Sequence, residues 1–433
     1  MLRTPATLLL LLAFVTCAAS ASAKSSSSML SVLSESDELT EPVSPPKNED
    51  PELFAEDFED FWSFIDRYYA YLDDIAADWD QAHDIYAPLA ANAPDEPAFI
   101  AVLERALGEL YDHHAHLHTH TDRSPRAVPS GTDLWGAWDD SVIVITDVRE
   151  DSHAAEAGLK PGMTVVAIDD TPVADAVQRV LPRTLTTDTA EAWNWATRQV
   201  LAGRHDSPVH LQMADRQVFA FTPGLQRPRE PLSYEMREDG VGYIRVHNSL
   251  GEDALVSAFD NAMAELQDTP ALILDLRDTP SGGNTTIARS LMGRLVHEET
   301  AYQRHEIPAE ERLIGVRRFW VEYVAPRGPF QYSGQVIVLV GRWTGSMGGG
   351  IAIGLDGANR ATVVGRPMAG LRGALASHTL PNTDIAVMIP SEKLSHVDGT
   401  PREAFVPTVL TEASDYASGE DLAIEAALQM LQR

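Results

Sequence analysis

Residues 51 to about 110 carry the apolar spacing of amphipathic helices. One set of apolar side chains recurs at alternating intervals of four and three, which places it on a single helix face. The set is Phe54, Phe58, Phe61, Ile65 and Tyr68. A second run, roughly residues 97–110, has the same period. Such faces usually belong to a core, so we predict an N-terminal helical domain over residues 51–127.

Strand-like runs dominate the next segment, residues 128–222. Residues 142–148 and 163–168 are short and rich in β-branched side chains, as expected for strands. Between them, residues 151–162 contain a short helical pattern, a glycine stop at Gly158 and a Pro-Gly turn. We therefore predict a separate β-rich domain here.

From about Tyr234 the pattern alternates between strands and helices. The predicted strands are residues 241–246, 271–276, 336–340, 361–364 and 384–389. The predicted helices are residues 250–266, 285–295 and 421–431. This alternation indicates an α/β core over residues 230–433, with a mainly parallel sheet whose functional groups gather at the carboxyl ends of the strands.

Two glycine-rich turns follow predicted strands of this core. One is Arg277-Asp-Thr-Pro-Ser-Gly-Gly-Asn284, and the other is Gly341-Arg-Trp-Thr-Gly-Ser346. A serine at a strand-to-helix turn is exposed beside the first N–H groups of the helix, as acyl transfer requires. The turn lacks the G-x-S-x-G form, so Ser346 alone fits a helix N-cap as well as a nucleophile.

A histidine cluster, His113-His-Ala-His-Leu-His-Thr-His120, follows the second predicted helix. The alternate histidines from His114 to His120 would share one face of a strand and could bind a metal ion. One of them could instead be a catalytic base brought to Ser346 by folding. The third alternative is a solvated polar turn, and the spacing leaves all three open.

The first residues have the pattern of an export signal. Residues 1–23 combine Arg3, an apolar stretch and a small-residue cleavage site, and residues 24–50 resemble a disordered linker. The single cysteine, Cys17, lies inside the signal, and the threonine before it is a poor match to a lipoprotein site. We therefore expect an exported chain, periplasmic or secreted, that folds without disulfides.

The net charge of −31 argues against two classes of partner. A chain this acidic repels the phosphates of DNA and RNA and the headgroups of anionic membranes. We expect neither nucleic acid nor such a membrane as a partner, and the charge favours solubility.

Taken in order, these motifs resemble the C-terminal processing, or tail-specific, family of serine peptidases. The resemblance runs from about Phe54 to Leu431, and its most specific parts are the two glycine-rich turns. It implies a crotonase-like peptidase core. The run from Ala155 to Gly162 resembles a PDZ domain, which implies an inserted module that binds peptide C-termini by strand addition.

The resemblance also bears on the catalytic base. In the bacterial processing branch a lysine follows the serine, but this chain has Leu371 at that position, and neither the adjacent Arg372 nor Lys393 is a good substitute. The tricorn-like branch takes its base from an Asp-x-His turn, and Asp112-His113-His114 fits it. By this resemblance His114 is the base and Glu403 its acidic partner.

The implied oxyanion donors are the N–H of Met347 and that of Gly282 or Gly283. The resemblance thus implies an exported serine peptidase with a Ser346-His114-Glu403 triad, a peptide or protein substrate and no cofactor or metal. The alternative is a non-catalytic protein that keeps the fold and binds peptides or ligands. The missing lysine motivates it, as does Gly349, which stands where many relatives have glutamate.

Overall fold

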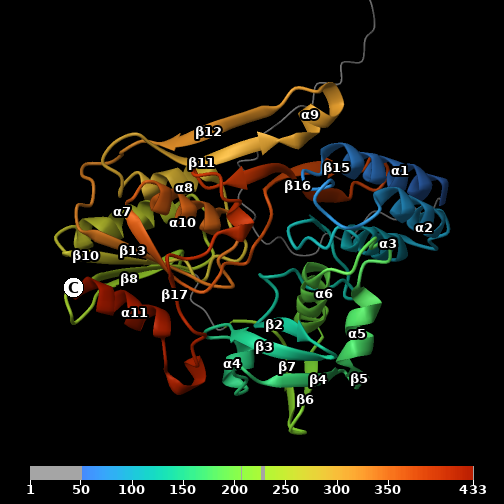
Figure 1. The fold of residues 1–433 in the computed structure, drawn as a ribbon, viewed down its shortest axis with the longest axis horizontal. Coiled ribbons are helices and arrows are strands. Elements are labelled where there is room, and N and C mark those ends of the chain that lie inside the picture. The colour runs from blue at the N-terminus through green and yellow to red at the C-terminus, as the bar shows by residue number, and fades with distance from the viewer. Residues whose placement is uncertain (1–50, 206, 226–229, 433) are drawn as a thin grey trace, which may run out of the picture. The chain divides into compact units, whose positions relative to one another are not determined.

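Helix α1 (Pro51–Tyr68) opens the part of the chain that the computed structural model describes, residues 51–205, 207–225 and 230–432. Helices α2 (Trp79–Ala91) and α3 (Glu96–Gly108) pack beside it (Figure 1). The predicted apolar face of α1 is buried, since Phe54, Phe61 and Ile65 are fully inaccessible to solvent. This face therefore contributes to a core.

The core of these helices also includes residues from the C-terminal half of the chain. Leu380, Ile385, Val387 and Ile389 pack in the same apolar cluster. The carboxylate of Asp57 on α1 reinforces the contact, because it accepts hydrogen bonds from the N–H of Asn382 and from the N–H and hydroxyl of Thr383, at 2.6–2.9 Å. Residues 51–110 are thus anchored to a hairpin more than 270 positions further along the chain.

A six-stranded antiparallel sheet covers residues 134–221, with the order β2-β3-β4-β6-β7 and β5 paired to β4. Its strands are β2 (Leu134–Asp139), β3 (Val142–Val148), β4 (Thr164–Ile168), β5 (Thr171–Pro172), β6 (Val209–Met213) and β7 (Val218–Phe221). Its helices are α4 (His153–Glu156), α5 (Val173–Val180) and α6 (Ala190–Ala202). The sheet and helices enclose their own apolar cluster.

A second six-stranded sheet has the order β17-β14-β13-β10-β9-β8. Its strands are β8 (Leu232–Met236), β9 (Gly242–Val246), β10 (Ala271–Asp275), β13 (Gln335–Val340), β14 (Ala361–Gly365) and β17 (Val409–Leu410). All neighbours pair in parallel except β8 and β9. The mainly parallel sheet predicted from the sequence is confirmed.

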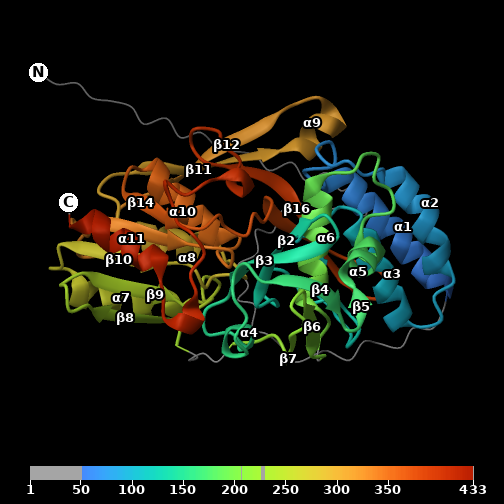
Figure 2. The ribbon, with the colours of Figure 1, turned by 60° about the horizontal axis from the view of Figure 1, so that its bottom comes forward.

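Helices cover both faces of this parallel sheet (Figures 1 and 2). On one side lie α7 (Ala254–Leu266), α8 (Thr285–Met292) and α10 (Met347–Gly357), which pack against Leu272 and Leu274 of β10. On the other side α11 (Leu422–Leu431) packs against Ile273. Because successive side chains of a strand point to opposite faces and both faces are covered, the first four residues of β10, Ala271 to Leu274, are apolar.

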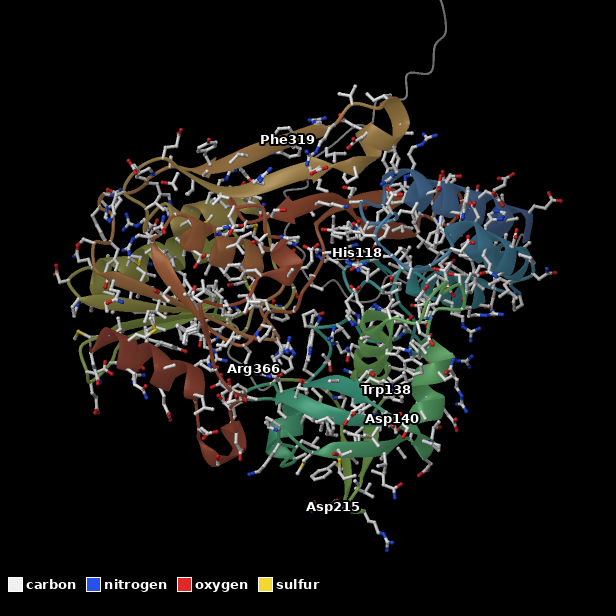
Figure 3. The ribbon with its side chains drawn as sticks, in the orientation of Figure 1. His118, Trp138, Asp140, Asp215, Phe319 and Arg366 are labelled. Atoms are coloured by element: carbon white, nitrogen blue, oxygen red, sulfur yellow. The ribbon has the colours of Figure 1, made fainter. Side chains whose placement is uncertain are left out.

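The third sheet joins distant segments in the order β1-β16-β11-β12, with β15 paired to β16. Its strands are β1 (His116–Leu117), β11 (Thr300–Ile307), β12 (Arg318–Val324), β15 (Ala374–Thr379) and β16 (Ala386–Ser395). Helix α9 (Pro308–Ile314) connects β11 to β12, where Phe319 is exposed (Figure 3). Two 3-10 turns, η1 (Arg402–Ala404) and η2 (Tyr416–Ser418), complete the described chain.

The apolar pattern located β9, β10, β13 and β14 of the parallel sheet to within one residue, but missed β8, β17, α2, α5, α6 and the β11–β12 pair. The predicted strand at residues 384–389 belongs instead to β16 of the third sheet, where its neighbours pair antiparallel. The predicted signal segment, residues 1–23 with Cys17, and the predicted linker, residues 24–50, lie outside the described residues. Within residues 51–432, apart from the gaps named above, no helix is long and apolar enough to cross a membrane.

Candidate active site

The two glycine-rich turns lie side by side at the carboxyl ends of β10 and β13. Thr279 N–H donates to the Trp343 carbonyl at 3.0 Å, and Gly345 N–H donates to the Thr279 carbonyl at 3.1 Å. The hydroxyl of Thr344 donates to the Leu276 carbonyl at 2.9 Å. These bonds fix the serine turn against the turn that carries Gly282 and Gly283, as the sequence analysis expected for one edge of a parallel sheet.

Ser346 occupies the N-cap position of α10 without acting as a cap. Its backbone has φ 43° and ψ −112°, in the left-handed region that a residue with a side chain enters only at a cost. Its side chain makes no capping hydrogen bond. The half-buried hydroxyl is therefore not committed to the helix end, which separates Ser346 from an ordinary N-cap serine.

Gly282 packs directly against Ser346. It has φ +69°, and a Cβ at this position would lie 2.4 Å from the Ser346 Cβ and 2.9 Å from the Met347 nitrogen. The Gly282 N–H itself donates to the Thr279 carbonyl at 3.1 Å. Among the described residues, the N–H groups of Gly283 and Met347 have no such acceptor. These two N–H groups remain the available donors beside the serine.

Leu371 lies beside the serine turn. A Cβ on Gly345 would lie 3.2 Å from the Leu371 Cδ1. Leu371 is buried in an apolar cluster with Trp343, Val128 and Ala369. A hydrocarbon side chain cannot accept a proton, so Leu371 cannot act as a base beside Ser346.

His114 is buried, with 6 % of its surface exposed, in the turn between α3 and β1. The backbone N–H of His114 donates to Asp112 Oδ1 at 2.9 Å. The ring nitrogen Nδ1 lies 2.5 Å from the Arg372 carbonyl oxygen. A carbonyl oxygen only accepts, so Nδ1 carries the hydrogen and Nε2 has the free lone pair. Burial, reinforced by the charge of Arg402, lowers the pKa of His114 to about 3, so the ring is neutral at physiological pH.

The charged groups around His114 satisfy one another. Asp112 also accepts from the Tyr69 hydroxyl at 2.9 Å, and burial raises the pKa of the Asp112 carboxyl. The Arg372 guanidinium donates to the Tyr69 hydroxyl at 3.1 Å and to Glu191 at 2.5 Å. This buried network holds the main chain at both Asp112 and Arg372, and with it the imidazole between them.

Glu403 lies in the short turn η1, next to the buried Arg402. One carboxylate oxygen, Oε2, is buried and has no hydrogen-bond partner. The adjacent Arg402 donates to the carbonyls of Leu371 and Gly373, at 3.3 and 2.6 Å. The Nδ1 of His114 is bonded to the Arg372 carbonyl and not to Glu403, which sequence reasoning did not anticipate because a backbone acceptor leaves no trace in residue type.

His114 and Ser346 approach the same segment, residues 369–372, from different sides. Ala369 N–H donates to the Thr344 carbonyl at 3.1 Å on the serine side, while the Arg372 carbonyl binds His114. Among the described residues, no hydrogen bond joins the Ser346 hydroxyl to the imidazole. The structure thus brings the predicted residues to one region without a direct bond between them.

The remaining histidines make separate contacts. The His116 Nδ1 is bonded to the His114 carbonyl, and His120 stacks on His205. Within the described part of the chain, no group of three or more His, Cys, Asp or Glu side chains could hold a metal ion. The metal-binding alternative therefore gains no support from the structure.

Known proteins share this architecture. The chain resembles the solved structure of a putative peptidase from Parabacteroides merdae, with 17 % identity and a TM-score of 0.54; the match covers 89 % of this chain and 98 % of that one. It resembles mature CPAF with 15 % identity and a TM-score of 0.57; that match covers 88 % of this chain and 96 % of CPAF. It also resembles the photosystem II D1 C-terminal processing protease, with 16 % identity and a TM-score of 0.51; this match covers 84 % of this chain and 93 % of that one. At these identities the likeness concerns the fold. No curated protein sequence matches the chain significantly.

Two segments match known families by sequence. Residues 50–108, which include α1 to α3, match the tricorn protease C1 domain, and residues 240–410, which include both glycine-rich turns and Glu403, match peptidase family S41. The resemblance inferred from the motifs is therefore confirmed for these segments: residues 240–410 are similar to peptidase family S41 and residues 50–108 to the tricorn protease C1 domain.

Proposed function

We propose that the protein hydrolyses peptide bonds through an acyl-enzyme formed on Ser346. The observation that carries the proposal is the backbone of Ser346, strained at φ 43°, with a hydroxyl that caps nothing and lies against Gly282. Strain at a non-glycine residue persists where the surrounding structure enforces it, and it concentrates at functional sites. A nucleophile on a tight strand-to-helix turn has this property.

Met347 and Gly283 supply the oxyanion donors in this proposal. Both have backbone N–H groups with no acceptor in the described structure; Met347 directly follows Ser346, and Gly283 directly follows Gly282, which packs against the serine. Gly282 contributes by lacking a side chain, since a Cβ there would collide with Ser346. Donors that are fixed before the reaction stabilise the developing negative charge at no cost in reorganisation.

His114 is the base. Its neutral ring, with Nδ1 held by the Arg372 carbonyl, leaves Nε2 ready to take the Ser346 proton. The serine oxygen then attacks the carbonyl carbon, and the protonated imidazole gives its proton to the leaving amine. Water, deprotonated by the same nitrogen, hydrolyses the acyl-enzyme. The proposal requires His114 and Ser346 to approach within hydrogen-bond distance when substrate binds, as catalytic pairs often do.

Glu403 is the acidic partner. Its unbonded, buried oxygen places negative charge near the segment that holds His114, where it favours the imidazolium formed during proton transfer. The Arg372 carbonyl performs the other task of a triad carboxylate, which is to fix the tautomer. Leu371 excludes the Ser-Lys alternative at its usual position.

The wider assignments belong to the same proposal. The sheet of residues 134–221 would be a PDZ-like module that binds substrate C-termini, and the parallel sheet with its helices a crotonase-like core. The strands β2 through β7 form one antiparallel sheet, and α4 and α5 lie between strands in the sequence. This arrangement supports the PDZ-like module. We also propose export to a periplasm or beyond, on the pattern of residues 1–23.

A non-catalytic, peptide-binding protein is the second candidate. One observation favours it: no hydrogen bond joins Ser346 to His114 among the described residues. Such a protein would bind peptides through the same fold and leave every bond intact.

Labelling with a fluorophosphonate probe separates the two candidates. The native protein should react covalently, Ser346→Ala should not react, and His114→Ala should react about 10³-fold more slowly. Labelling that survives in Ser346→Ala would refute the assignment. A native, folded protein that never reacts would favour the non-catalytic candidate.

A further inference from the structure

A small cavity of about 40 Å³ lies at the carboxyl ends of β13 and β14, where they meet the end of β3. Its walls come from segments far apart in sequence. They are residues 147–150, Arg245, Arg277, residues 340–343, Arg366, and Thr411, Ala413, Ser414, Tyr416 and Ala423. The labelled Arg366 reaches from β14 toward β3 (Figure 3). The volume suffices for one small ion or a few water molecules.

The walls of this cavity are unusually basic for so acidic a chain. Five guanidinium groups line it, those of Arg149, Arg245, Arg277, Arg342 and Arg366. Only two lining residues carry carboxylates, Asp147 and Glu150. The other acidic partners, Asp275 and Asp421 of Arg277 and Asp278 of Arg149, are not part of the wall. An occupant of the cavity therefore faces more positive than negative groups.

Two buried N–H donors in the wall lack acceptors. Arg149 is 5 % exposed and uses its terminal nitrogens on the Ser130 carbonyl and Asp278, which leaves its Nε–H without a partner. The Nε–H of Arg245 is also buried and unpartnered, while its terminal nitrogen binds Glu150 at 2.6 Å. Buried donors without acceptors are rare in native proteins, so each calls for a ligand.

One carboxylate serves two of the arginines. Asp147 accepts from Arg366 at 2.8 and 3.2 Å and from Arg342 Nε at 3.3 Å. Burial lowers the pKa of Arg149 to about 10 and lowers that of Arg342, whereas acidic neighbours raise the pKa of Arg245 and Arg277 despite their burial. Arg149 has Asp278 as its own ion-pair partner, whereas Arg342 and Arg366 share Asp147, so the guanidinium charge is least compensated at the Arg342–Arg366 pair.

We propose that this cavity is a binding site for a small monovalent inorganic anion of the size of chloride. The anion accepts from the unpartnered N–H groups and balances the excess guanidinium charge. It thereby joins the end of β3 to the strand end that leads into the serine turn. The small volume excludes larger organic anions such as gluconate, and oxyanions with several charged oxygens are disfavoured by Asp147 and Glu150 in the wall.

Bromide identifies the occupant directly. Crystals of the full chain grown with sodium bromide should show an anomalous scattering peak inside the cavity, because bromide replaces chloride. A cavity filled only by water, with no anomalous peak at high bromide concentration, would overturn the proposal. This measurement needs no variant and no enzymatic activity.

Thermal unfolding tests the same site in solution. Replacing sodium gluconate with sodium chloride at equal ionic strength should raise the melting midpoint by about 2 °C or more. Arg342→Met should abolish this difference, and Asp147 retains Arg366 in that variant. Arg318→Met, which removes an exposed partner of Glu310, is the matched control, and its melting midpoint should still differ between the two salts. Equal midpoints in the two salts for the native protein would contradict a chloride site, and a rise with sulfate alone would point to another anion.

Discussion

The Nδ1 atom of His114 lies 2.5 Å from the carbonyl oxygen of Arg372, a residue 258 positions further along the chain. Arg372 directly follows Leu371, which lies beside the serine turn. The segment that packs beside the serine turn therefore also holds the His114 ring. It does so with a backbone atom, which any residue at position 372 would provide.

The pH dependence of labelling should reflect this environment. Because burial lowers the pKa of His114 to about 3, the ring stays neutral far below the ordinary midpoint of about 6.5. As the pH is lowered through 6.5, the fluorophosphonate labelling rate should not fall, provided that circular dichroism shows the protein to be folded. A titration of the rate centred near 6.5 would contradict the buried, neutral base.

Stability should depend on pH in the matching direction. In the unfolded chain His114 takes up a proton below about pH 6.5, whereas in the folded protein it does so only near pH 3. Its contribution to the free energy of unfolding is therefore complete above pH 6.5 and is lost as the pH falls toward 3. Urea unfolding of the native protein and of His114→Gln should give curves that converge on acidification.

Gly282 can be tested against a glycine with the same backbone. Gly282→Ala places a methyl group 2.4 Å from the Ser346 Cβ, whereas Gly315, with φ +71°, has open space around it. Both variants should lose about 1 kcal/mol of stability through the left-handed backbone, and Gly282→Ala should lose more because its methyl group collides with Ser346. Only Gly282→Ala should lower the labelling rate, by about 10² or more. Equal labelling of the two variants would show that Gly282 is an ordinary turn residue.

Leu371 should not tolerate a charge. It is buried among Trp343, Val128 and Ala369, so Leu371→Lys places an ammonium group where the cluster offers no partner. We expect a loss of roughly 3 kcal/mol in chemical unfolding. Leu371→Met, which keeps the volume and polarity, should lose less than about 1.5 kcal/mol. A stable Leu371→Lys protein would indicate that this region opens to solvent.

Asp57 should be essential for docking α1 to the β15–β16 hairpin. Its buried carboxylate accepts three hydrogen bonds from Asn382 and Thr383, so Asp57→Ala removes the acceptor from three donors. A loss of about 3 kcal/mol in the free energy of unfolding is expected. Asp66→Ala, on the exposed face of the same helix, is the control and should change stability by less than about 0.5 kcal/mol.

Periodicity predicted the parallel sheet well because its strands are buried on both faces. Ile273 and Leu274 of β10 pack against opposite helical layers, and such a run has few alternative structures. The β11–β12 pair escaped prediction for the opposite reason. Its sequence mixes apolar residues with Arg, Glu and His, and apolar side chains of β12, such as Phe319, are exposed.

The candidate site was predictable in its residues and not in its geometry. Ser346, His114 and Glu403 were identified through motifs whose order resembles a known family, and their roles remain a prediction. The hydrogen bond from His114 to the Arg372 carbonyl could not be predicted, because main-chain acceptors are common to all residues. The same holds for the commitment of the Gly282 N–H to Thr279, which leaves Gly283 as the available donor.

The central claim is that Ser346 is a nucleophile activated by His114. Mass spectrometry of the fluorophosphonate-treated, proteolysed protein tests it most directly, because it locates the adduct on a single residue. We predict one phosphonylated residue, Ser346, whose modification disappears or slows sharply in His114→Ala. An adduct on another serine, or modification of Ser346 at the same rate without His114, would contradict the account.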